Sequence, residues 1–221
     1  VGWDLVMQQS AWAHLQVARQ TVETYGCPLA YYCDNHSLFR YVGYHSRHYS
    51  YKTRPDEGKT QFRRALKMLG IDLIYTEKGH AEAKGKVEKR FDFFQRRVPV
   101  RFEQYRVKTP EEGRPIVEDL VGYYNEERVH QETGEIPAKR WERAIKEDKG
   151  RLRPVPGEAD LEMIFSLHDR RTVRKDGTIL VNGKFWNVGR FREQTVTVCF
   201  IPGKKFLVVR GAQRLCEYEI G

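Results

Sequence analysis

Near the start of the chain, apolar residues recur at intervals of three and four. This spacing predicts an amphipathic helix over residues 10–25, with Ser10 as its N-cap. Gly26 ends this pattern, and the apolar run 29–33 that follows has the length of a buried strand. The run 1–6 before the helix also predicts a strand. This order of strand, helix and strand is typical of an α/β sheet.

A second helix and strand repeat the same order further along. Helical spacing over 60–69 is followed by the strand-like run 71–75, whereas the polar and aromatic residues 40–58 have no sustained period and predict a loop insertion. Asp34 directly follows the strand 29–33. We therefore expect its carboxylate at the carboxyl end of a strand, where open α/β sheets bind ligands.

Three more helices are predicted over 84–98, 115–125 and 137–146. Proline stands at the expected first position of the last two, and Pro99 is expected to end the first. Within 84–98 the spacing of Val87, Phe91 and Phe94 predicts a buried stripe, and Glu88 lies beside that stripe.

The pattern changes after residue 146. Residues 147–160 are charged and rich in proline and glycine, as linkers between domains often are. From 161 onward, short alternating runs separated by turn sequences predict a small antiparallel barrel. We expect strands in this region over 171–174, 178–181, 184–188, 195–200 and 206–209. The sequence thus predicts a unit over 1–146, a linker over 147–160 and a β unit over 161–221.

The charge balance indicates an anionic partner. The chain has 39 Lys plus Arg against 30 Asp plus Glu and a formal net charge of +9, and residues 149–221 hold 14 of these basic residues against 8 acidic ones. A basic surface of this kind is typical of nucleic-acid-binding proteins, although a soluble basic protein without such a partner has the same composition.

Cysteine spacing and hydropathy exclude several other classes. The four cysteines form no C-x-x-C pair, which indicates reduced, buried side chains rather than a zinc knuckle or a disulfide framework. His45 and His48 have the spacing of half a zinc site, but no cysteine pair completes it, so a solvated loop is the simpler reading. No run approaches the ~20 apolar residues of a membrane span. We expect no membrane partner.

The acidic residues Asp34 and Glu88 have two readings. On a helix surface, Glu88 can pair with Lys84, and Asp92 with Lys89, as ordinary stabilising ion pairs. Alternatively, Asp34 and Glu88 are ligands of Mg²⁺ or Mn²⁺, which prefer carboxylate oxygens. Nearby basic residues would then hold a phosphodiester, and two metal ions about 4 Å apart would support an in-line phosphoryl transfer.

Several motifs in their order resemble a known family. Asp34-Asn35-x-Ser37-x-Phe39 and the segment 83–91 around Glu88 resemble the second and third acidic motifs of the DDE transposase and retroviral-type integrase core. Tyr124-Asn125-x-x-Arg128-x-His130 resembles the region downstream of the core in bacterial insertion-sequence transposases. The segment 171–186 resembles the small barrel that follows the core in Mu-type transposases, where it is associated with DNA binding and assembly.

The resemblance implies a ribonuclease H-like α/β core, lacking its first strand, followed by a small SH3-like barrel. It implies a DNA transposase or integrase that uses Mg²⁺ or Mn²⁺ to cleave the 3′ ends of a mobile element and join them to target DNA. Asp34 and Glu88 would be the catalytic metal ligands. The partners would be DNA, both the element ends and the target, and further copies of the chain. The protein would be located in the bacterial cytoplasm, at the nucleoid. The expected DNA-binding residues are Lys84, Lys86, Lys89, Arg90, Asn125, Arg128 and His130.

Three departures from the family pattern matter. The first catalytic Asp of the family should precede Val1, so this stretch alone is expected to be inactive. Asp34 and Glu88 are further apart than in retroviral integrases, and the loop 40–58 can absorb the difference. Asp92 and Gln95 occupy positions where related enzymes often carry basic DNA-contacting residues. Asn125, Arg128 and His130 could instead stabilise the helix junction, and a catalytically inactive DNA-binding relic of a transposase is the alternative function.

Overall fold

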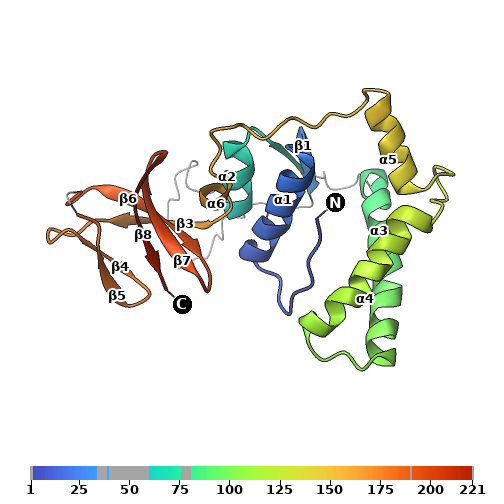
Figure 1. Ribbon diagram of the computed structural model, residues 1–221, viewed down its shortest axis with the longest axis horizontal. Coiled ribbons are helices and arrows are strands. Elements are labelled where there is room, and N and C mark those ends of the chain that lie inside the picture. The colour runs from blue at the N-terminus through green and yellow to red at the C-terminus, as the bar shows by residue number, and fades with distance from the viewer. Residues whose placement is uncertain (1, 34–38, 40–59, 76–80, 190, 221) are drawn as a thin grey trace, which may run out of the picture.

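The computed structural model describes residues 2–33, 39, 60–75, 81–189 and 191–220, and for 81–87 it describes the backbone alone. The chain forms a mixed helix and sheet protein in three parts along its long axis (Figure 1). Helices α1 and α2 with strand β1 lie in the middle, the helices α3, α4 and α5 at one end, and the strands β3–β8 at the other.

The middle part, here called the α/β unit, follows the predicted order. Helix α1 (Ala11–Tyr25) begins at Ser10, whose Oγ accepts the N–H of Ala13 at 3.2 Å. Strand β1 (Ala30–Cys33) pairs in parallel with β2 (Asp72–Tyr75), and α2 (Gln61–Met68) connects back to β2 as the spacing predicted. The prediction of a strand over 1–6 was wrong within the described residues 2–6: the N–H groups of Gly2 and Trp3 instead bond side chains of α1.

The helical unit comprises α3 (Ala81–Gln104), α4 (Pro110–Gly122), the π-helical turn η1 (Tyr123–Glu127) and α5 (Pro137–Lys146). The prediction for α5 is confirmed, but two other boundaries were wrong. Pro99 lies inside α3 instead of ending it, because both Pro99 and Gln95 are exposed and water can reach the carbonyl that Pro99 cannot bond. Helix α4 begins at Pro110, since Thr109 and Glu112 form a capping box there.

The buried side of α3 also differs from the prediction. Phe91 is 60% exposed, whereas Phe93 is only 3% exposed because Tyr124 of η1 packs against its ring. Phe94 is partly buried, as expected, and the side chain of Val87 lies outside the description. The position of η1 thus determines which face of α3 is buried.

The β unit begins with the short helix α6 (Leu161–Ile164). An antiparallel sheet follows in the order β3 (Leu167–Thr172), β6 (Thr195–Ile201), β7 (Lys205–Arg210) and β8 (Gln213–Glu219). The hairpin β4 (Thr178–Val181) and β5 (Lys184–Asn187) turns at Asn182 and Gly183, both with positive φ, as the sequence predicted. Strand β3 begins earlier than expected, and β8 was not predicted.

Two hydrophobic cores involve the α/β unit and the β unit. One lies within the β unit, around Val173, Ile179 and Phe206. The other joins side chains of α1 and α2, such as Leu15 and Leu66, to Phe165, Cys199 and Leu207 of the β unit. The chain is therefore α/β as expected, while a ribonuclease H-like core, an SH3-like barrel and the division at 147–160 stay predictions.

Candidate nucleic-acid interface

Two aromatic rings form the centre of the candidate site. Phe93 of α3 and Tyr124 of η1 lie with ring centroids 5.0 Å apart, and their exposed fractions are 3% and 4%. The π-helical turn places Tyr124 there, and it ends with the N–H of Arg128 bonded to the carbonyl of Tyr123 at 3.0 Å. Such turns are frequent at functional sites.

Three guanidinium groups lie against these two rings. The Cζ atoms of Arg97 and Arg128 are 4.1 and 4.6 Å from the centroid of Phe93, and those of Arg128 and Arg90 are 5.6 and 5.7 Å from that of Tyr124. A cation–π contact contributes about 0.5–2 kcal/mol, which orients a guanidinium but leaves its charge in place. We call Arg90, Arg97 and Arg128 the arginine cluster.

The three residues of the arginine cluster have no carboxylate partner among the described residues, whereas three cations near them do. Arg96 pairs with Asp92 at 2.6 Å, Lys89 with Glu132, and Arg143 with Glu135 at 2.8 Å. Acidic residues are therefore available nearby and neutralise other cations. Three oriented and uncompensated guanidiniums on one surface suit an oxyanion such as a phosphate, which they can bind bidentately.

A groove of about 810 Å³ adjoins the arginine cluster between the α/β unit and the helical unit. Arg90, Asn125 and His130 line it, opposite Tyr25 of α1, whose ring meets that of Trp141 at 6.0 Å. The structure thus brings together Arg90, Asn125 and His130, and Arg128 adjoins them through the Tyr124 ring.

The remaining predicted DNA-binding residues are less available. Lys89 is held by Glu132, and the side chains of Lys84 and Lys86 lie outside the description. The backbone N–H of His130 bonds the carbonyl of Glu135 at 2.9 Å, so this residue also closes the turn before α5.

The predicted metal ligands are not brought together by the described residues. Asp34 lies outside them, although β1 ends at Cys33, directly before it. Glu88 is exposed on α3, two residues before Arg90. Among the described residues no group of three or more His, Cys, Asp or Glu side chains is placed to hold a metal ion. The carboxylate chemistry fits Mg²⁺ or Mn²⁺, and the pairing of Asp34 with Glu88 stays a prediction.

The alternative pairing of Asp92 with Lys89 was wrong. Asp92 bonds Arg96, one turn further along α3, and Lys89 reaches Glu132 beyond η1. The alternative pairing of Glu88 with Lys84 stays a prediction because the Lys84 side chain is not described. A further acidic residue, Asp4, is also held in an ion pair: it contacts Arg114 of α4 at 2.5 Å.

Sequence reasoning missed Arg97 and the two rings that orient the arginine cluster. A signal was present: Phe93-x-x-x-Arg97 and Tyr124-x-x-x-Arg128 each place an arginine four residues after an aromatic residue. On a helix this spacing puts both side chains on one face. Applied to α3, it would have selected Arg97. Arg128 follows η1 with an extended backbone, so helical spacing does not account for its place beside Tyr124.

The fold and the arginine cluster define a basic α/β protein with a site suited to a polyanion. Comparison with known proteins narrows this class. The chain is 30% identical over 120 residues to the transposase for insertion sequence IS1202 of Streptococcus pneumoniae, covering 54% of this chain and 24% of that protein. It is 31% identical over 84 residues to y4bF of Sinorhizobium fredii, which is named as a candidate transposase, covering 38% of this chain and 16% of that protein.

The similarities to these two relatives agree with the resemblance of the chain's motifs to transposases. The chain spans about a quarter or less of their length. No protein-family model matches it. A solved structure, the simian T-cell lymphotropic virus intasome in complex with PP2A regulatory subunit B56 gamma, aligns over 91% of this chain and 59% of that chain, at 12% identity and a TM-score of 0.43.

Within the part of the chain that the structure describes, no helix is both long and apolar enough to cross a bilayer. Cys27 and Cys199 are buried, as their sequence surroundings indicated, whereas Cys33 and Cys216 are only partly buried.

Proposed function

We propose that the chain is part of a DNA transposase that binds DNA through the α3–η1 surface and transfers phosphoryl groups in a metal-dependent site. The observation that carries the proposal is the arginine cluster, whose three guanidiniums are oriented by Phe93 and Tyr124 and have no described carboxylate partner. The similarity to transposases supports DNA as the polyanion.

In this proposal each part of the site has a separate task. The planar forks of Arg97 and Arg128 bind phosphates of the backbone, and Asn125 and Arg90 contact the strand where it enters the groove. Asp34 and Glu88 hold Mg²⁺ or Mn²⁺. The bound metal supplies activation of the attacking oxygen and stabilisation of the leaving one.

The proposed substrates are the ends of a mobile element and a target DNA. In cleavage, water attacks the phosphodiester at the element end and frees a 3′-hydroxyl there. In strand transfer, that hydroxyl attacks a target phosphodiester, forms a new bond to its phosphorus and releases the 3′-hydroxyl of the cut target strand. Insertion of a whole element joins both of its ends to one target site, so the chain would act as a homo-oligomer assembled on DNA.

The test uses the full-length protein and compares three variants. Asp34→Asn and Glu88→Gln remove proposed metal ligands, and Asp92→Asn is the matched control because Asp92 lies on the same helix and pairs with Arg96. We expect Mg²⁺-dependent joining to be lost in the first two and kept in the third, with DNA binding retained in all. Normal joining by Asp34→Asn or Glu88→Gln would refute the metal-ligand assignment. DNA binding without joining by the unmodified full-length protein would identify an inactive relic.

A further inference from the structure

The segment between α5 and the β unit is fastened to the α/β unit at Arg153. The backbone N–H and carbonyl of Arg153 exchange hydrogen bonds with Cys27 at 2.9 and 2.8 Å, and its guanidinium donates to the carbonyls of Leu69 and Gly70 at 3.2 and 2.7 Å. A flexible tether makes no such set of bonds. Arg153 therefore attaches this segment to the residues that follow α1 and α2. We call the segment at Arg153 the strap.

A second attachment joins α2 to the start of the β unit. The guanidinium of Arg64 donates to the carbonyls of Ile164 and Ser166 at 2.9 and 2.7 Å, and to Gln61 at 3.2 Å. Burial lowers the pKa of Arg64 to about 10, so it is still charged at neutral pH. Separation of the two units would exchange the two carbonyl bonds from this charged, partly buried donor for bonds to water, so the bonds favour the joined arrangement.

Gln61 adds a two-way bond to strand β3. Its amide donates to the carbonyl of His168 at 2.8 Å and accepts the N–H of the same residue at 3.0 Å. Side-chain amide groups paired in this way with one backbone residue imitate an adjoining strand. Gln16 of α1 also donates to the carbonyl of Phe165, at 3.3 Å.

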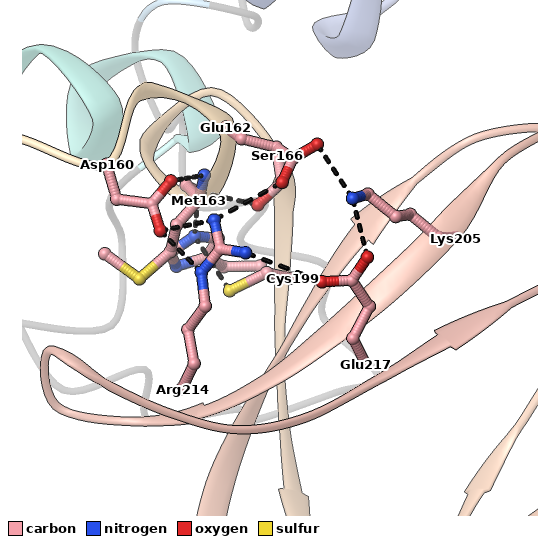
Figure 2. A network of polar contacts seen from close by, with 9 residues as sticks. Asp160, Glu162, Met163, Ser166, Cys199, Lys205, Arg214 and Glu217 are labelled. Carbon is pink, nitrogen blue, oxygen red and sulfur yellow. Dashed lines mark hydrogen bonds and ion pairs between the residues drawn. The ribbon is translucent and has the colours of Figure 1, made fainter.

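Helix α6 is in turn tied to the far strands of the sheet (Figure 2). Arg214 of β8 contacts Asp160 and Glu162 at 2.5 and 3.3 Å, and Lys205 of β7 contacts Glu162 and Glu217 at 3.1 and 2.7 Å. Burial alone would raise the pKa of Asp160, but the N–H of Met163 and the Arg214 guanidinium hold it below its ordinary value. A backbone carbonyl of α6 thus accepts a hydrogen bond from Arg64 of the α/β unit. The side chains of Asp160 and Glu162, at the start of α6, form ion pairs with the sheet.

The shared hydrophobic core completes this connection, since Phe165, Cys199 and Leu207 of the β unit are fully buried in the same cluster as Leu15 and Leu66. A large apolar contact of this kind suppresses the relative motion expected of linked domains. We propose that the β unit and the α/β unit form one rigid body, with Arg64 as the residue that fixes one unit against the other. This proposal concerns only the joint between the units and does not depend on the proposed function.

The consequence is a fixed geometry for the cations of the β unit. The β unit cannot move relative to the α/β unit to bring its basic side chains to a distant ligand, because α2, α6 and the sheet move together. Any polyanion bound by the β unit must lie at one set position relative to α1 and α2.

Pulsed electron paramagnetic resonance tests the joint on the 221-residue chain. Ketone-reactive spin labels are attached to unnatural residues at two exposed positions, Thr24 of α1 and Lys204 of the β6–β7 turn. Three chains are compared: the unsubstituted one, Arg64→Met, and the control Arg63→Met, whose arginine is exposed one residue earlier on α2. We expect a single narrow distance distribution for the first and third. For Arg64→Met we expect a distribution about twofold broader, since the two carbonyl bonds are lost.

A broad distribution in the unsubstituted chain, or an unchanged one in Arg64→Met, would overturn the proposal. Gln61→Ala keeps the test decisive if Arg64→Met does not fold. It removes the two bonds to His168 and the acceptor of one Arg64 bond but leaves the Arg64 bonds to Ile164 and Ser166, so it should give an intermediate width. An unchanged width in a folded Gln61→Ala chain would likewise count against a rigid joint at α2.

Discussion

The guanidinium of Arg128 lies over the ring of Phe93, with its Cζ atom 4.6 Å from the ring centroid. Arg128 follows η1 and Phe93 belongs to α3, so this contact joins two elements that are distant in sequence. Arg97 approaches the same ring at 4.1 Å. One buried phenylalanine thus orients two arginines whose charges stay uncompensated by any described carboxylate.

Phe93→Leu should weaken DNA binding without changing the charge of the chain. Leucine keeps the site apolar but gives Arg97 and Arg128 no ring face, so their guanidiniums lose orientation. We expect a several-fold loss of affinity with an unchanged slope of log K against log salt, because the number of phosphate contacts is the same. The substitution should cost about 1–3 kcal/mol of unfolding free energy in urea titrations.

Phe94→Leu is the matched control for that experiment. Phe94 also contacts Phe93 and Tyr124, but no arginine of the described chain lies over its ring. Equal losses of DNA affinity in the two variants would show that ring packing, and not the orientation of the arginines, sets the affinity.

The unfolding free energy should rise with pH between about 4 and 6.5 through His168. Burial and then Arg64 lower the pKa of His168 to about 4, from an ordinary value of 6.5. Between these values the unfolded chain binds a proton that the folded chain does not, so acidification favours unfolding. The partly exposed ring limits this effect to roughly 2 kcal/mol.

Urea titrations at several pH values, compared between the unsubstituted chain and His168→Gln, measure this contribution. The difference between the two unfolding free energies should change across this pH range and level off above pH 7. A difference that stays constant with pH would show that His168 is not the group responsible.

Gly26→Ala should destabilise the strap at Arg153. Gly26 has φ +88, and a Cβ there would lie 2.5 Å from the Arg153 carbonyl oxygen, so alanine adds a clash to an unfavourable backbone conformation. We expect a loss of about 2–4 kcal/mol of unfolding free energy. Gly134→Ala is the control, because Gly134 has φ +65 with nothing within 4 Å of the added Cβ. Its loss should be about 1 kcal/mol, and similar losses at both positions would argue against a close contact at the strap.

Local signals allowed much of the fold to be predicted. Ser10 is the N-cap of α1, Pro137 begins α5, and Asn182-Gly183 forms the turn of the β4–β5 hairpin. Each of these features depends on neighbouring residues alone. The failures involve distant partners. Phe93 instead of Phe91 is buried because η1 covers that side of α3, and no periodicity within α3 identifies the covering element.

The candidate site was predictable to a similar extent. The motif around Tyr124 singled out Asn125, Arg128 and His130, and the structure places them with Arg90 at one groove and its adjoining rings. Lys89 was expected on the DNA-binding surface, but its ion pair with Glu132 depends on the path of the chain beyond η1. The attachment of Arg64 to α6 could not be predicted, because it joins segments separated by the whole helical unit.

The most direct test of the DNA-binding surface compares two adjacent arginines. Arg97 is stacked on Phe93 without a described carboxylate partner, whereas Arg96 is paired with Asp92. Binding of a short fluorescent duplex to the 221-residue chain is measured by anisotropy over a series of salt concentrations. Arg97→Gln should lower the affinity and reduce the slope of log K against log salt by about 0.9, the loss of one phosphate contact, while Arg96→Gln should change neither. Equal effects of the two substitutions, or no DNA binding by the unsubstituted chain, would contradict the assignment of the arginine cluster as a DNA-binding site.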